Sequence, residues 1–415
     1  MAIKINTTIH RAVPVINDDG LILAVLMNAR QTDANGTVVT EPEVLRINSL
    51  EDLTKNFAQS FAEGGEGSEV NTSLQVLREL HALEYLLRGG ANLLVLATEV
   101  VGTFSVTDAA KLRVEDVTYK VALAPYHFIS SSALDGLDLI VSEGSELESV
   151  DATLLLDVLP TLPVGQINNI NINQPRISLN INSAIVPFTS VYKWGELDYI
   201  DFHVSSNGYD AETDFVGIPA SVFVALREAI NLNKGEAWVP VAGETTGIFT
   251  EATKVFRKFT TPEKNTFQAG HINPMVLKRG IGILMVAQNT SYKPADTRNP
   301  LRRKHIVSLV LAIKRRVRAI SERFLFASNT SNTWDAYKLE LDDYLGKLYR
   351  AGGLTEFKTV VDNTLITNDD INNGIMRAYI EITPVGVVEG MEINIAIREH
   401  ADSVDVMIDG LEGGI

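Results

Sequence analysis

Few residues of this chain stand in combinations that could carry catalysis. Asp198 and Asp201 lie beside His203, and a carboxylate next to an imidazole could serve a hydrolase as general acid and base. No Gly-x-Ser-x-Gly motif supplies a nucleophile for such a set, so we expect it to have no catalytic role. His81 and Glu84 are three residues apart on a predicted helix, and this pair is typical of a solvated polar face.

The chain also lacks the patterns that hold phosphates and metals. Gly346 and Lys347 are followed by Leu348 inside a predicted helix, so they do not form the loop that cradles a nucleotide phosphate. There is no cysteine, and the seven histidines are scattered without zinc-ligand spacing. The acids between Asp362 and Asp370 lack the spacing of a calcium loop and indicate a solvated loop. We therefore expect no enzyme activity, no cofactor and no metal.

Charge is unevenly distributed along the chain. The formal net charge is −16, from 36 basic and 52 acidic residues, which argues against a dedicated nucleic-acid-binding protein. The segment from Arg298 to Arg323 nevertheless holds nine basic residues and a single acid, Glu322, so this segment carries +8 and the rest of the chain −24. Such a protein has two electrostatically distinct faces.

The basic segment coincides with the clearest helical pattern in the sequence, which starts near Pro300. Apolar residues share one face at 3.6-residue spacing from Ile306 to Phe324. The cations must then project from the other faces, either as a solvated surface with scattered ion pairs or as a contact surface for an acidic partner. The charge segregation favours the second interpretation. The candidate contact residues are Arg302, Arg303, Lys304, Lys314, Arg315, Arg316, Arg318 and Arg323.

Strands and helices alternate in the first hundred residues, which is typical of an α/β unit. Apolar runs over 21–27 and 91–97 predict buried strands, and leucines at helical spacing after Ser73 predict a helix that ends at Gly89-Gly90. Isoleucine alternates with asparagine over 166–183, which fits either edge strands with one polar face or an exposed loop. No apolar run approaches the roughly 20 residues of a membrane span, and the N-terminus lacks the apolar core of a secretion signal.

The C-terminal half is patterned more sharply. It predicts a helix over 219–231, a glycine-bearing strand or hairpin over 277–287, and a helix over 333–350 with Thr333 as N-cap and Gly352-Gly353 as terminator. A short helical turn is predicted over 371–376, and strands are predicted over 357–361, 377–383, 391–398 and 404–409.

The order of these motifs resembles the conserved domain of contractile tail sheath proteins. The resemblance is good over about 210–398, moderate over 20–100 and weak over 100–200. Ala220-Ser221 stands where the family more often has Ser-Gly. The motifs that carry the resemblance are Ile218-Pro219, Trp238, Asn273-Pro274, Gly280-Ile281-Gly282, Asn299 to Arg303, Phe324-Leu325-Phe326, Asn329, Thr333-Trp334, Gly352-Gly353, and Phe357 with Val361 and Asp362.

The resemblance implies a mixed α+β or α/β fold. An inner conserved domain would hold a mixed sheet and packed helices, beside an outer variable domain and extended arms at the two termini. On this chain the N-terminal arm would cover 1–20, the outer domain 21–205, the inner domain 206–400 and the C-terminal arm 401–415. The implied function is a structural subunit that polymerises as stacked hexameric rings around an inner tube. Contraction, without nucleotide hydrolysis, would drive the tube through the target cell envelope.

The implied partners are further copies of the chain, the tail tube protein, and the baseplate and tail terminator proteins. The resemblance implies no direct nucleic-acid contact and no membrane insertion, and it makes the basic helix the candidate tube-facing surface. The implied setting is a phage virion tail assembled in the host cytoplasm. A headless bacteriocin, a type VI system or another cellular injection machine would use the same polymer. A soluble hydrolase that uses Asp198, Asp201 or His203 is the less favoured alternative.

Short alternating strands at both ends of the chain could pair with other chains. An isolated strand has unpaired N–H and C=O groups on both edges, which favours pairing with a neighbour. The resemblance implies such exchange between subunits, and the alternative is that these strands join the chain's own sheets. The candidate exchange residues are Ile3, Ile5, Thr7, Ile9, Met391, Ile393, Ile395, Ile397, Val404, Val406 and Ile408.

Overall fold

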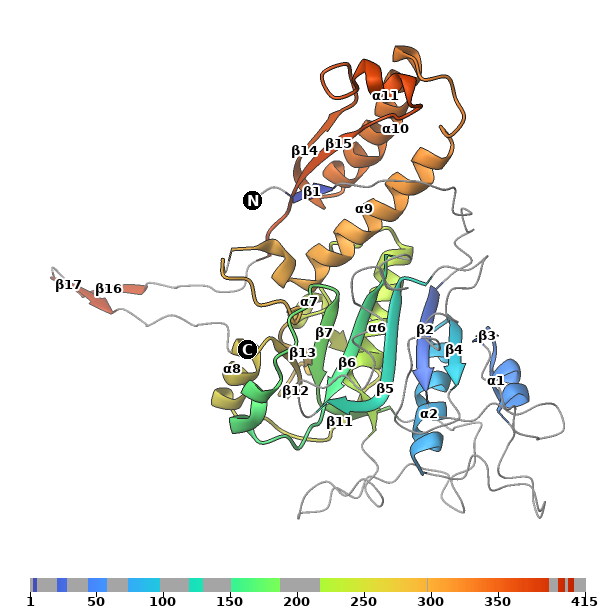
Figure 1. Ribbon diagram of the computed structural model, residues 1–415. Helices are drawn as coiled ribbons and strands as arrows, with labels where there is room; N and C mark the ends of the chain where they lie inside the picture. Colours follow the sequence, from blue (N-terminus) through green and yellow to red (C-terminus); the bar gives the residue numbers. More distant parts are fainter. Residues whose placement is uncertain are drawn as a thin grey trace.

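The fold consists of a large mixed sheet with helices on its faces and a smaller C-terminal unit, which are connected through one long helix, α9 (Figure 1). This architecture comes from a computed structural model. The residues that it describes are 3–5, 21–27, 44–57, 74–97, 119–129, 151–186, 217–296, 298–387, 395–399 and 402–406.

Nine of the described strands form one sheet in the order β10-β13-β12-β7-β6-β5-β2-β4-β3. The strands from β4 to β12 in this order run parallel, whereas β3 at one edge and β13 and β10 at the other are antiparallel to their neighbours. The strands are β2 (Leu21–Met27), β3 (Val44–Ile47), β4 (Ala91–Ala97), β5 (Val121–Ile129), β6 (Thr153–Val158), β7 (Ile177–Ile181), β10 (Ile248–Phe249), β12 (Ile272–Lys278) and β13 (Gly282–Met285).

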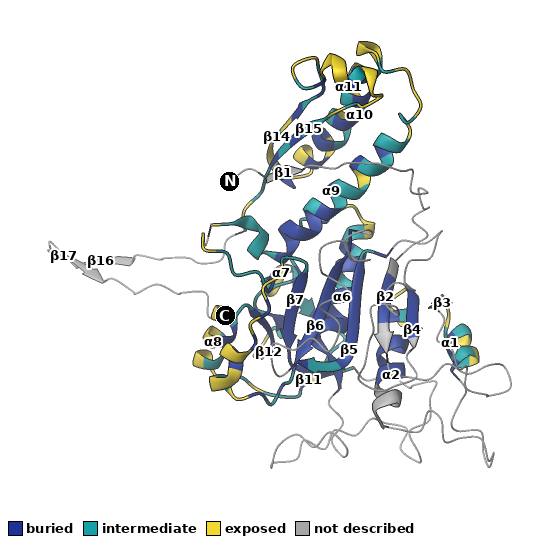
Figure 2. Cartoon of the chain, in the orientation of Figure 1, coloured by how far each residue is buried: buried dark blue, intermediate teal, exposed yellow. Residues whose placement is uncertain are grey.

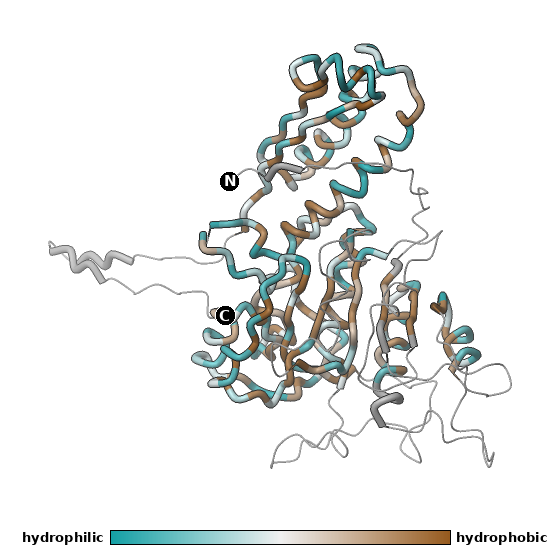
Figure 3. Tube along the Cα trace, in the orientation of Figure 1, coloured by the Kyte–Doolittle hydropathy of each residue, from teal (hydrophilic) through white to brown (hydrophobic). Residues whose placement is uncertain are grey.

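The parallel strands are mostly apolar because both faces of the sheet are covered. Successive side chains of a strand point to opposite faces: Leu23 and Val25 of β2 join one hydrophobic cluster, and Ala24 joins the other. Helices α1 (Leu50–Asn56), α2 (Leu74–Arg88) and α6 (Ala220–Asn233) contribute to the first cluster, and η1 (Val164–Asn169) and α8 (Thr261–Ala269) to the second. The central strands β5, β6 and β7 are accordingly mostly dark blue in Figure 2 and mostly hydrophobic in Figure 3.

A third hydrophobic cluster belongs to the C-terminal unit. Its helices α9 and α10 pack against a three-stranded antiparallel sheet of order β1-β15-β14. The elements of this unit are β1 (Ile3–Ile5), α9 (Lys304–Glu322), α10 (Ser331–Arg350), β14 (Leu354–Val360), α11 (Asn368–Asn372) and β15 (Tyr379–Pro384). The N-terminal strand thus shares one sheet with strands from the opposite end of the chain.

Short elements complete the described chain. Three strands form a small sheet of order β11-β8-β9, and two strands form an antiparallel hairpin near the C-terminus. These elements are η2 (Pro300–Arg302), α7 (Gly243–Thr246), β8 (Ser183–Ile185), β9 (Ile218–Pro219), β11 (Lys254–Val255), β16 (Ile395–Glu399) and β17 (Asp402–Val406).

Most predicted elements of the C-terminal half are confirmed, and two local predictions are wrong in part. The helix predicted over 333–350 begins at Ser331 with Thr330 at the N-cap, so Thr333 lies inside the first turn. The segment over 166–183 is divided: Asn168, Asn169, Asn171 and Asn173 are exposed, as a loop predicts, whereas β7 lies between β6 and β12 and is not an edge strand. The asparagines of the buried part, Asn180 and Asn182, lie inside the protein, where the Asn182 side chain donates to the carbonyl oxygens of Arg257 and Met275, each at 2.8 Å.

The mixed α/β fold class is confirmed. The nine-stranded sheet, however, takes strands from both sides of the boundary proposed between residues 205 and 206: β2 to β7 come from one side, and β10, β12 and β13 from the other. One continuous sheet therefore crosses that boundary. The sequence pattern missed this arrangement because the pairing of β7 with β12 joins strands that are far apart in the chain.

Candidate functional site

The basic helix α9 forms as its periodicity predicted. Leu309, Ile313, Val317 and Ile320 are buried in the C-terminal hydrophobic cluster. This apolar face fixes the rotation of the helix, so the basic residues project from its other sides. Where each cation then points decides whether α9 can offer a charged surface to a partner.

Three of the candidate cations converge on one buried acid, Asp151. Lys314 Nζ lies 2.8 Å from Asp151 Oδ1, and Arg318 Nη1 lies 2.8 Å from Oδ2. The Arg315 guanidinium donates to the backbone carbonyl of Asp151, and Arg176 lies 3.8 Å from its carboxylate. A fully buried carboxylate is costly unless cations compensate it. We therefore expect these interactions to hold α9 against the sheet.

The backbone conformation of Asp151, as well as its charge, determines where its carboxylate lies. It lies two residues before β6 and has a φ of 56°, in the left-handed region that aspartate tolerates better than most residues. This turn places the carboxylate at the start of a central strand of the sheet. Asp151 thus connects β6 with α9, two elements that are distant in the sequence.

A second carboxylate holds the beginning of α9. Glu228 on α6 forms a buried ion pair with Lys304, the first residue of α9, and accepts a hydrogen bond from the Ser308 hydroxyl. Burial lowers the pKa of Lys304 to about 7. The pair borders a cavity of about 20 Å³, also lined by Asn231 and His305, which has room for roughly one water molecule. A cavity this small offers no substrate site.

Of the other candidate cations, two are exposed and two are half-buried. Arg316 is exposed, with its guanidinium 5.9 Å from the centre of the Tyr344 ring. Arg323 is also exposed and forms an ion pair with Glu340 of α10. Arg302 and Arg303 belong to the turn that precedes α9, where the Arg302 carbonyl accepts a 2.8 Å hydrogen bond from the Thr290 amide. The predicted set is therefore divided: Lys304, Lys314, Arg315 and Arg318 contact Glu228 or Asp151, while Arg316 and Arg323 face solvent.

The sequence analysis missed Asp151, Glu228 and a third buried acid, Asp157. Asp157 on β6 accepts hydrogen bonds from the Ser221 amide, at 3.0 Å, and from the Ser221 hydroxyl. Asp157 thereby accepts a hydrogen bond from a backbone amide in the first turn of α6, where Pro219 occupies the N-cap and provides no capping side chain. Burial raises the pKa of Asp157 to about 7. Glu228 had a detectable signal, because it follows a long apolar stretch of its helix, and an acid that is buried there requires a partner.

The Asn-Pro motif at Asn273-Pro274 has a structural role in β12. Proline has no N–H to donate to a neighbouring strand, and the buried Asn273 side chain supplies hydrogen bonds beside it. Its amide nitrogen donates to the carbonyl oxygens of Leu179, at 3.0 Å, and Asn289, at 2.8 Å, and its oxygen accepts from the Asn289 amide at 2.6 Å. The motif therefore ties β7, β12 and the segment before α9 together.

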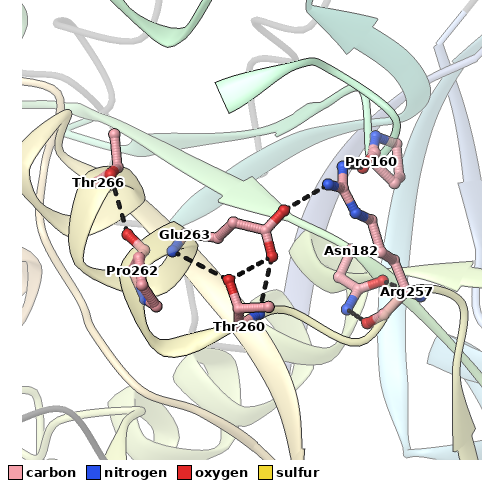
Figure 4. A network of polar contacts seen from close by, with 7 residues as sticks. All are labelled: Pro160, Asn182, Arg257, Thr260, Pro262, Glu263 and Thr266. Atoms are coloured by element: carbon pink, nitrogen blue, oxygen red, sulfur yellow. Dashed lines mark hydrogen bonds and ion pairs between the residues drawn. The ribbon is translucent and has the colours of Figure 1, made fainter. Parts of the chain in front are cut away.

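A neighbouring network centres on Arg257 (Figure 4). Its guanidinium donates to the Pro160 carbonyl at 2.9 Å and pairs with Glu263 at 2.6 Å. Glu263 also closes a capping box with Thr260 at the start of α8. Asn182 exchanges two hydrogen bonds with the Arg257 backbone, so the loops at this end of the sheet are fixed to one another.

The remaining chemical candidates do not form a site. His81 and Glu84 are buried, not solvated as predicted, and burial lowers the pKa of His81 to about 3. The solvated loop predicted over 362–370 is confirmed for Asp369, which is exposed, but not for Asp370, which is buried, closes a capping box with Thr367 and pairs with Arg377 at 2.7 Å. Asp198, Asp201 and His203 lie outside the described residues.

Within the described ranges, no group of three or more histidine, aspartate or glutamate side chains could hold a metal ion. No helix in the described part of the chain has the length and apolarity needed to cross a membrane.

The terminal strands lie partly within the described chain. Ile3 and Ile5 belong to β1, which pairs with β15 of the same chain in the register Ile3↔Ile382. Ile395 and Ile397 of β16 face Val406 and Val404 of β17 in the C-terminal hairpin. Exchange with another copy stays a prediction. The remaining candidates, Thr7, Ile9, Met391, Ile393 and Ile408, lie outside the described residues.

One protein whose role is named is similar to this chain in sequence. It is 22% identical over 198 residues to the tail sheath protein of Vibrio phage KVP40, and the aligned region makes up 42% of this chain and 29% of the phage protein. No protein-family model matches the chain.

Three solved assemblies contain chains of similar fold. A chain of the anti-feeding prophage baseplate has a TM-score of 0.64 at 15% identity and covers 96% of this chain and 98% of its own. The contracted helical sheath of the same system has a TM-score of 0.62 at 16% identity, over 95% and 100%. The contracted PVC sheath complex of an extracellular contractile injection system has a TM-score of 0.64 at 14% identity, over 96% and 97%. The resemblance found in the sequence motifs is thereby confirmed, and the chain has the fold of the contractile tail sheath family.

Proposed function

We propose that the chain is the sheath subunit of a contractile injection machine, which works by polymerising and not by catalysis. The fold similarity to chains of sheath assemblies, over 95% or more of this chain, carries the proposal. The match with a phage tail sheath protein supports it independently from sequence. The subunits would stack as hexameric rings around an inner tube and contract without nucleotide hydrolysis. At one end of the sheath, they would join a baseplate.

The division of the α9 cations refines the proposed contact with the tube. Arg316 and Arg323 are exposed and can meet acidic groups of a partner, whereas Lys314 and Arg318 are engaged with Asp151. The inner cations would hold the helix in place, and the outer cations would make the contact. Single exposed charge pairs contribute about 0–1 kcal/mol, so many weak contacts along a sheath would add up and yet release cooperatively.

The position of β1 allows strand exchange between subunits, although β1 pairs with a strand of its own chain here. β1 forms an edge of the sheet β1-β15-β14 through backbone pairing with β15. An equivalent strand from a neighbouring copy can make the same pairs, because exchange of an identical element between protomers preserves its contacts. The hairpin of β16 and β17 would supply the corresponding link at the other end of the chain.

A machine of the anti-feeding prophage or PVC type is the second candidate setting beside a phage tail. The chain covers 97% or more of the matched chains from those systems, but its alignment covers 29% of the phage protein. Particles purified from the source organism would distinguish the two settings, since a phage tail carries a DNA-filled head.

Negative-stain electron microscopy of the purified chain tests the proposed function. We expect hollow tubes or helical polymers whose wall consists of this chain. A discrete monomer or small oligomer at high concentration, with both termini intact, would contradict the proposal. That result would favour the alternative, a soluble enzyme.

A further inference from the structure

Phe326 has features that the fold itself does not require. It lies in the loop between α9 and α10, and its side chain is fully exposed, at 104% of the reference area. Its φ of 64° places a bulky residue in the left-handed region. Both features are unfavourable in an isolated subunit, because exposed aromatic surface and a left-handed aromatic residue each cost free energy. Their combination at one residue points to a binding role.

The other residues of the same motif are used inside the subunit. Phe324 packs edge-on against Tyr337, with ring centroids 5.2 Å apart. Asn329 accepts a hydrogen bond from the Trp334 indole at 2.7 Å, and the Thr333 hydroxyl donates to the Ser328 carbonyl at 2.7 Å. These contacts account for the residues around Phe326, whereas its ring serves no contact in the subunit's core.

Further hydrogen bonds fix the loop that carries Phe326. The Ala327 amide donates to the Phe324 carbonyl at 3.2 Å, so Phe326 stands at the tip of a closed turn. Asn329 also donates to the Ile375 carbonyl at 3.2 Å, which ties the loop to the segment after α11. A rigid loop loses little conformational entropy on binding, and this favours an anchor over a merely exposed side chain.

We propose that Phe326 is an apolar anchor that inserts into a neighbouring copy of this chain, an inference that rests on the proposed sheath function. Ile375, itself 42% exposed, would contribute apolar surface from the adjoining segment. In Figure 1 the α9–α10 loop and α11 lie at the same end of the C-terminal unit. That segment leads directly into β15, the strand that pairs with β1. The anchor is thus continuous with the sheet proposed to exchange strands, which favours a second copy over another partner.

The decisive variant is Phe326→Gly. Glycine adopts a left-handed backbone conformation without strain, so the variant should unfold at the same temperature as the wild type or higher. Its critical concentration for polymerisation should nevertheless rise at least about tenfold, as truncation of a central aromatic anchor does. Phe326→Ser should raise the critical concentration as well. Leu339→Ser is the matched control, because Leu339 is exposed on the same unit in ordinary helical conformation, and it should polymerise like the wild type.

Pelleting assays over a concentration series, with and without the tube protein, separate the outcomes. Wild-type polymerisation by Phe326→Gly in the absence of tube would overturn the inference, whether or not binding to the tube were lost. An equal defect in Leu339→Ser would also overturn it, because exposed apolar surface in general would then explain the effect. If the wild-type chain itself formed no polymer, the proposed function would fail, and that result is distinct from either of these.

Discussion

The nine-stranded sheet and the C-terminal unit bury their apolar residues to different degrees. The central strands of the sheet are covered on both faces, and the acids inside it, Asp151 and Asp157, have fixed partners. The C-terminal unit leaves Phe326 and Ile375 exposed, together with the exposed α9 residues Arg316 and Arg323. From this comparison we infer that the sheet is a buried frame, and we propose that the C-terminal unit carries the contact surfaces. The following variants test this division.

Deletion of residues 402–415 should have the largest effect, because it removes β17 and with it the C-terminal link between subunits. Polymerisation should be abolished in electron micrographs, while the melting temperature stays unchanged, since β16 and β17 pair with each other and with no other described strand. Deletion of 410–415 is the control and should polymerise normally. Intact sheaths from the longer deletion would place the contact surfaces elsewhere.

Asp151→Asn tests the attachment of α9 to the sheet. Removing one member of a buried ionic cluster leaves the opposite charges uncompensated, which costs about 3–5 kcal/mol. Urea denaturation should show a loss of stability of that order. The control is Asp343→Asn, which removes an exposed pair with Lys347 at 2.7 Å and should leave stability nearly unchanged. Equal losses in the two variants would refute the role of Asp151.

Asp157→Asn tests the buried acid beneath α6. Burial raises the pKa of Asp157 to about 7 in the folded chain, so the folded state binds its proton more tightly than the unfolded state, whose pKa is about 3.9. This contribution to stability is complete below about pH 4 and is lost as the pH rises to 7.

The asparagine variant lacks this dependence. Relative to the wild type, its stability should therefore increase between pH 4 and 7, by at most about 4 kcal/mol. Thermal unfolding of both proteins across this range isolates the effect of Asp157, because the buried histidines of both proteins titrate alike. A difference that does not change with pH would contradict the assignment.

Reversing the charge of the exposed α9 cations should change the stability of the subunit less than substitution of Asp151 or Asp157 does. The double variant Arg316→Glu with Arg323→Glu should alter the free energy of unfolding by less than about 1 kcal/mol but weaken assembly on the tube, most clearly at low salt. Lys314→Glu with Arg318→Glu should instead destabilise the subunit, because both residues contact Asp151. The same loss of stability in both variants would abolish the distinction between inner and outer cations.

Local patterns were sufficient to predict many elements of the fold. The 3.6-residue periodicity of α9, the apolar runs of β2 and β4, and the glycines between β12 and β13 each predicted an element that the structure contains. These patterns depend on residues close together in the sequence, which interact within a single turn or strand. The ordered motifs of the C-terminal half also sufficed to identify the fold family.

The tertiary structure alone decided which charges are available to a partner. The sequence placed eight cations in one group, but it could not show that Asp151, which is distant from Lys314 in the chain, would engage part of them. Likewise, Asn180 and Asn182 share one alternating pattern with exposed asparagines, and only the tertiary structure shows that these two are buried, with Asn182 donating two hydrogen bonds. Contacts between distant segments leave no periodic signal, because they arise only when the chain has packed.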